Sequence, residues 1–114
     1  MEYNNDFKHD LKVGQVKEQE LGDILNSKTI EVKWDLQALQ TKNVYIEYES
    51  RGKPSGISKT SAEVYCFCFG KTFHLIYTEV LKQRCRKYIN TIRDKKGGDN
   101  NTSKGIILPI DELF

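Results

Sequence analysis

The chain has 114 residues, which suits one domain with one hydrophobic core and leaves no room for two. Hydrophobic residues make up 38% and aromatic residues 11%, so the chain can bury enough apolar area to fold, and this excludes intrinsic disorder. Eighteen basic and sixteen acidic residues leave a net charge of +2, which neither requires nor excludes a nucleic-acid partner.

Two features bear on the compartment. No apolar run approaches the roughly 20 residues of a membrane-spanning helix, and the polar, acidic first residues are the opposite of a secretory signal. Cys66 and Cys68 alternate within one apolar run and Cys85 is distant, a spacing that does not suit zinc. We therefore expect reduced, structural cysteines, no membrane partner and a cytoplasmic location.

The first elements follow from periodicity. Within a single domain spanning 1–114, residues 1–12 are polar and expected to be flexible, and a helical pattern of apolar residues begins at Val13. Asn26 and Ser27 are expected to end that helix. Residues 29–34 alternate and are rich in β-branched side chains, which predicts a strand.

The remaining pattern predicts mainly strands. We expect strands at 43–49, 64–69, 73–77 and 105–108, a loop at 50–56, a short helical turn at 60–63, a helix at 78–90 and a loop at 95–104. This order indicates an α/β (α+β) domain with one mixed β-sheet flanked by helices. Its predicted core includes Trp34, Tyr65, Phe67, Phe69 and Phe73.

The most informative residues are Glu31 and Lys33. Side chains two apart on a strand point to the same side, so a carboxylate and an ammonium share one face while Ile30, Val32 and Trp34 share the other, core-facing one. Hydrolysis of a phosphodiester needs such a pair: the carboxylate holds a divalent ion, and the lysine orients or deprotonates the attacking water.

A magnesium site usually has more than one oxygen ligand, and several acids could supply the others. Asp23 would converge on Glu31 if residues 22–33 formed a hairpin turning at Asn26 and Ser27. Glu18 on the preceding helix, Asp35 on the same strand face, and Glu47 on the next strand are further candidates. If the helix instead runs through to Leu25, Asp35, Glu47 or Glu49 would have to complete the site.

A simpler interpretation is a solvated strand face, in which Lys33 pairs across the sheet with Glu47 or Glu49 for about 0.2–1 kcal/mol. Against it stands the concentration of acids on what could be one sheet face, where like charges repel unless a cation binds.

These motifs resemble a known family. The run from Asp23 to Glu31-x-Lys33 is similar to the D…(D/E)-x-K signature of the PD-(D/E)XK nuclease superfamily, and Gly14-Gln15-Val16-Lys17-Glu18 resembles the start of the first helix in its resolvase-like members. Residues 43–57 and 97–105 resemble segments of small bacteriophage proteins of that superfamily. The resemblance implies a restriction-endonuclease-like core, Mg²⁺ or Mn²⁺ as cofactor, and catalytic roles for Glu31, Lys33, Glu18 and Asp23. It also implies the host-cell cytoplasm as the location of a phage-encoded chain.

The predicted function is metal-dependent endonucleolytic cleavage of DNA, with junction or branched DNA as one possible substrate. Arg51, Lys53 and Lys59 lie in loops around the acidic face and are candidate DNA contacts. A homodimer is expected, because many relatives pair to cut two strands. Two alternatives stay open: a non-catalytic nucleic-acid-binding module, and a protein-interaction domain, for which the sequence offers no obvious apolar patch.

Overall fold

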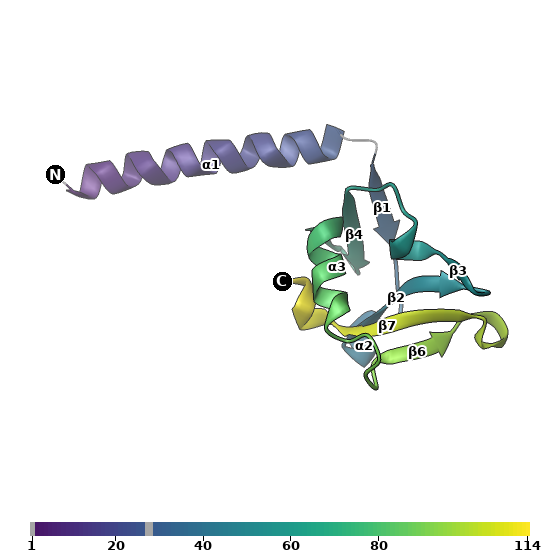
Figure 1. Ribbon diagram of the computed structural model, residues 1–114. Coiled ribbons are helices and arrows are strands. Elements are labelled where there is room, and N and C mark those ends of the chain that lie inside the picture. Colours follow the sequence, from purple (N-terminus) through teal and green to yellow (C-terminus); the bar gives the residue numbers. More distant parts are fainter. Residues whose placement is uncertain (1, 27–28) are drawn as a thin grey trace.

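The computed structural model describes residues 2–26 and 29–114, with side chains for 8–9, 11–26, 29–98 and 100–114. It is a mixed α and β structure with two separate sheets (Figure 1). The elements in chain order are α1 (Glu2–Asn26), β1 (Ile30–Lys33), α2 (Ala38–Thr41), β2 (Asn43–Ser50), β3 (Lys53–Pro54), η1 (Gly56–Ser58), β4 (Val64–Phe69), β5 (Thr72–Tyr77), α3 (Thr78–Arg86), β6 (Asp94–Gly97), η2 (Asp99–Asn101), β7 (Ser103–Pro109) and η3 (Ile110–Leu113).

The prediction of one mixed sheet is wrong. The first sheet has the order β1-β4-β5 and is mixed, because β1 runs parallel to β4 while β5 is antiparallel to it. The second has the order β3-β2-β7-β6 and its neighbouring strands are all antiparallel. Between β1 and β2 the short helix α2 ends at Lys42 in a left-handed conformation, and β2 then pairs with β7 rather than with β1.

The core lies where the two sheets and α3 meet. The first sheet contributes Tyr65, Phe67 and Ile76. The second contributes Val44, Ile46, Ile106 and Leu108, and α3 adds Leu81 and Cys85. Tyr65 and Phe67 belong to the predicted core, which this cluster confirms. All three cysteines are free thiols.

Helix α1 is longer than its pattern predicted. It begins at Glu2 rather than at Val13 and ends at Asn26, as expected; Ser27, the other residue of the predicted stop, lies outside the described residues. The helix projects from the rest of the fold (Figure 1). The chain as a whole measures 63 × 27 × 27 Å and has a radius of gyration of 17.5 Å. A compact domain of this length would have a radius of gyration of about 13 Å. None of the described helices is long and apolar enough to cross a membrane.

Three other elements differ from the sequence pattern. Strand β6 forms in the predicted loop 95–104; as a charged edge strand, Asp-Lys-Lys-Gly, it lacks the alternation that identifies a half-buried strand. The predicted helical turn at 60–63 is absent, and a 3-10 turn forms just before it, as η1. Helix α3 ends at Arg86, earlier than the predicted residue 90.

Strand β1 has the predicted alternation but the opposite orientation. Val32 is 62% exposed and Trp34 71%, and Phe73 on β5 is 67% exposed, so the prediction that Trp34 and Phe73 belong to the core is wrong. The polar residues of β1 lie on the side of Tyr65, which is in the core, because Glu31 is paired with Tyr65 in the parallel register. The apolar face of β1 therefore points outward.

Candidate active site

Glu31 and Lys33 lie side by side on β1. The Glu31 Oε2 and Lys33 Nζ atoms are 2.9 Å apart, and the hydroxyl of Thr60 donates a hydrogen bond of 2.9 Å to Glu31 Oε1. Thr60 comes from the loop that follows η1. The predicted carboxylate–ammonium pair is therefore present, and a hydroxyl that the sequence did not flag holds the second carboxylate oxygen.

The surroundings of Glu31 set its charge. Partial burial raises the pKa of its carboxyl group, but hydrogen bonds from Lys33 and Thr60 and the charge of Lys33 lower it by more, so the net pKa is below the ordinary value. Glu31 is therefore ionised at neutral pH, the form that can bind a cation.

Beside this pair is a hollow of about 230 Å³ that both sheets and η1 line. Lys33 and Tyr65 contribute from the first sheet, Tyr45, Ile46 and Glu47 from β2, and Gly56 and Ile57 from η1. Gly56 has φ +52°, and a Cβ there would lie 2.2 Å from the carbonyl oxygen of Glu47, so only glycine allows η1 to approach β2 this closely.

Tyr65 is the least satisfied polar group of the hollow. Its side chain is buried, and its hydroxyl interacts with the side chains of Glu31 and Thr60 but makes no hydrogen bond of good geometry to any residue that the structure describes. Burial, together with the negative charge of Glu31, raises its pKa to about 12, so the hydroxyl keeps its proton and can donate. The sequence placed Tyr65 in the core, and its isolated hydroxyl in an otherwise apolar strand is the signal that could have identified it.

Glu47 is the second acidic residue at this hollow. Its Oε2 accepts a hydrogen bond of 2.9 Å from Ser55, and its strand belongs to the second sheet. Glu49 does not accompany it: a bulge between Glu47 and Glu49 interrupts the alternation of β2, and Glu49 pairs with Lys104 at 3.7 Å. The acids of β1 and β2 thus lie on two sheets, not on one face, and Lys33 pairs with Glu31 on its own strand rather than across to β2.

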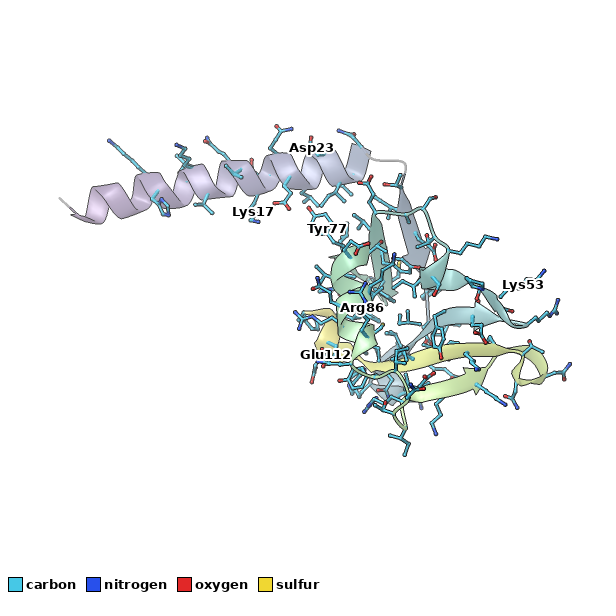
Figure 2. All side chains as sticks on the ribbon, in the orientation of Figure 1. Lys17, Asp23, Lys53, Tyr77, Arg86 and Glu112 are labelled. Atoms are coloured by element: carbon cyan, nitrogen blue, oxygen red, sulfur yellow. The ribbon has the colours of Figure 1, made fainter. Side chains whose placement is uncertain are left out.

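The other predicted acids lie elsewhere. Asp23 is on α1, where it accepts a hydrogen bond of 3.0 Å from Gln19, so residues 22–26 form a helix and not one arm of a hairpin (Figure 2). Glu18 is exposed on the same helix. Asp35 follows β1 and accepts the backbone N–H of Gln37, which supports the turn into α2.

Whether these residues suit a divalent ion depends on how many ligand side chains lie close together. Among the side chains that the structure describes, no three His, Cys, Asp or Glu residues are gathered closely enough to hold one metal ion. The structure therefore does not unite Glu18, Asp23, Glu31, Asp35 and Glu47. One carboxylate, Glu47, lines the hollow, and Glu31 is ion-paired with Lys33, which also lines it. Mg²⁺ is commonly held by one or two carboxylates together with waters and substrate phosphates.

The three candidate DNA contacts lie in and after the segments that follow β2, and none of them lines the hollow. Arg51 and Gly52 both have positive φ, the pattern of a tight two-residue hairpin connection, and Lys53 follows in β3 at the far end of the fold from α1 (Figure 2). Lys59 directly follows η1. Arg51, Lys53 and Lys59 are exposed, and none forms an ion pair within the described ranges.

Several basic residues of α3 and of the segment after it are, by contrast, paired. Lys82 pairs with Glu79, while Arg84 and Lys87 both reach Glu112. Arg93 is held by Asn43 and the carbonyl of Ile107. These contacts favour a structural role for these residues.

Comparison with known proteins adds no relative: no family model, no curated protein and no solved structure matches this chain.

Proposed function

We propose that this protein is a metal-dependent endonuclease that hydrolyses phosphodiester bonds in DNA, on a fold of the restriction-endonuclease-like PD-(D/E)XK type. The observation that carries the proposal is the Glu31–Lys33 pair, 2.9 Å apart, at a hollow that also contains Glu47. A lysine ion-paired with one carboxylate, at a hollow lined by a second, suits a reaction in which negative charge on a phosphate must be offset while water attacks.

Each residue has a role in this proposal. Glu31 and Glu47 would hold Mg²⁺ or Mn²⁺, which supplies a Lewis acid for the phosphate and lowers the pKa of bound water. Lys33, now paired with Glu31, would exchange that partner for a phosphate oxygen or orient the attacking water. The buried hydroxyl of Tyr65 would donate to a phosphate oxygen that enters the hollow. The exposed Arg51, Lys53 and Lys59 would contact the DNA backbone, with junction or branched DNA as the finer proposal for the substrate.

The test compares the wild-type protein with Glu31→Gln, Lys33→Met and Glu47→Gln on supercoiled plasmid and on a four-way junction, in Mg²⁺, Mn²⁺ or EDTA. We expect cleavage that requires the metal and falls by roughly 10²–10³-fold in each variant. Asp23→Asn and Glu18→Gln are the matched controls, since α1 places these acids apart from the hollow, and both should cut at the wild-type rate. Full cleavage by Lys33→Met would refute the proposed site.

A second candidate is a non-catalytic nucleic-acid-binding module. It is favoured by the closed Glu31–Lys33 ion pair and by the lack of a three-donor group among the described side chains. It predicts DNA binding that weakens with salt, does not change with Mg²⁺ and survives Glu31→Gln. A filter-binding titration of that variant with and without Mg²⁺ separates the two candidates.

A further inference from the structure

The outer face of the first sheet is apolar, and Val32, Phe73 and Tyr77 on it are exposed. Strand register places on this face three rows of side chains, and every member is aliphatic, aromatic or a cysteine: Ile30, Val64 and Tyr77; Val32, Cys66 and Leu75; Cys68 and Phe73. Val64 and Cys66 are buried yet lie outside the main core cluster, so this outer sheet face is a second apolar layer. Val32 and Phe73 are more than half exposed. Trp34, two residues after Val32, is also more than half exposed.

Helix α1 carries a matching surface. Leu11, Leu21 and Leu25 fall within about 80° of one another at 100° per residue, and each is roughly half exposed. Gly14 and the exposed Glu18 lie within the same arc, so this face is apolar except at Glu18. This leucine face points away from the helix's own domain, because Glu20, on the other half of the helix, accepts a hydrogen bond of 2.6 Å from Tyr77 of β5. Figure 2 shows Tyr77 directed toward α1.

The two surfaces agree in size. The leucine face extends for about 21 Å along the helix, and the six residues of β4 span about 20 Å. Leu11, Leu21, Leu25, Val32, Trp34 and Phe73 together expose on the order of 700 Å² per chain. Summed over the helix and the sheet, this approaches the ~800 Å² that each partner buries in a standard interface.

We propose that two copies of this chain pair by exchanging α1, so that the leucine face of each helix lies across the outer sheet face of its partner. One chain supplies both halves of the contact, and a two-fold axis makes the same contact twice, so the interface closes on itself at two copies. The hydrogen bond between Glu20 and Tyr77 keeps α1 in its projecting position. In that position the leucine face is open to a second copy and is turned away from the sheet of the same chain. The proposal stands independently of the nuclease assignment.

A disulfide trap tests this arrangement. Gly14 lies in line with the leucine face, and a Cβ there meets no atom within 4 Å, so Gly14→Cys adds a thiol without a clash. The native Cys68 is a partly exposed free thiol on the outer sheet face. With oxidised glutathione, we expect a covalent dimer whose linked peptides contain position 14 of one chain and Cys68 or Cys66 of the other.

Two other outcomes of the trap would overturn the proposal. A monomer with an internal bond from position 14 to Cys68 would place α1 on its own sheet. A dimer linked through position 14 of both chains, and still formed by Gly14→Cys with Cys68→Ser, would mean that the helices pair with each other.

Light scattering on the untrapped protein gives the second measurement. The wild type should be a dimer at micromolar concentration, and Leu21→Glu or Phe73→Glu should raise the dimer dissociation constant at least 100-fold. Val16→Glu is the matched control: Val16 is exposed on the same helix but lies half a turn from the leucine face, so this variant should stay dimeric. A monomeric wild type, or equal dissociation by Val16→Glu, contradicts the proposed interface.

Discussion

The two faces of the sheet β1-β4-β5 differ in a way that organises the molecule. The inner face carries Glu31 and Lys33 beside the buried Tyr65 and Phe67, so an ion pair adjoins the core. The outer face is apolar throughout, yet Val32 and Phe73 on it are exposed. Charges thus border the interior and hydrophobic side chains face outward, the reverse of the usual arrangement.

This inversion is the common ground of the two proposals, a polar ligand at the inner face and a second copy of the chain at the outer one. A partly buried ion pair gains little stability after its desolvation, so a stabilising role alone does not account for Glu31 and Lys33. An uncovered apolar sheet face loses the hydrophobic contribution that its burial would give. The inner face therefore suits a polar ligand in the hollow, and the outer face suits another protein surface.

The sharpest test of the difference uses one residue type on both faces. Phe67 is 2% exposed in the core, so Phe67→Ala should lower the free energy of unfolding by about 3–5 kcal/mol. Phe73→Ala on the outer face should cost less than about 1 kcal/mol at protein concentrations too low for pairing. Urea unfolding followed by circular dichroism measures both. Equal losses would mean that the outer face is covered within one chain.

A second pair of variants concerns tyrosine hydroxyls near the hollow. Tyr65→Phe removes a buried hydroxyl without a well-formed hydrogen bond among the described residues, and should stabilise the fold by about 1 kcal/mol. Tyr45→Phe is the control, because its hydroxyl is hydrogen-bonded to Ser103 at 3.0 Å, and it should destabilise by about 1 kcal/mol. If both variants destabilise the fold, the Tyr65 hydroxyl has a partner.

The local pattern of the sequence was sufficient to predict most strands and the contents of each strand face. The period of two in residues 29–34 predicts that Glu31 and Lys33 share a side, and they do. The same period does not determine which side is buried, because that depends on how β1 pairs with β4. The alternation of residues 29–34 therefore could not predict that Trp34 is exposed.

Long-range strand pairing also explains why the sequence did not predict how the residues of the candidate site are arranged. Glu47 was a candidate ligand, but its place at the same hollow as Lys33 depends on η1 and on β2 joining a second sheet with β7. Thr60, which is distant in sequence from β1, donates a hydrogen bond to Glu31. Ser55, which follows β2, donates one to Glu47. No sequence motif marks either residue. Asp23 required a hairpin, whereas the helical pattern that begins at Val13 simply continues to Asn26.

A smaller effect concerns the charge of the inner face. The pKa of Glu31 is lower in the folded chain than in the unfolded one, so its stabilising contribution is present above the unfolded value and is lost as pH falls through the folded value. In Lys33→Met the effect of burial remains while the largest opposing contribution disappears, so the pKa of Glu31 should rise. Carboxyl-carbon NMR titration measures it. Lys104→Met, which removes the partner of Glu49, should leave the pKa of Glu31 unchanged.

The smallest expected change is at Trp34, the only tryptophan of the chain. A core tryptophan would cost about 3–5 kcal/mol on replacement by alanine. Because Trp34 is largely exposed, Trp34→Ala should change the free energy of unfolding by less than about 0.5 kcal/mol at submicromolar protein. Iodide should quench wild-type fluorescence strongly under the same conditions, and less as concentration rises and copies pair. Strong protection at every concentration would show that the outer face is closed within the monomer, and the contrast between the two faces would fail.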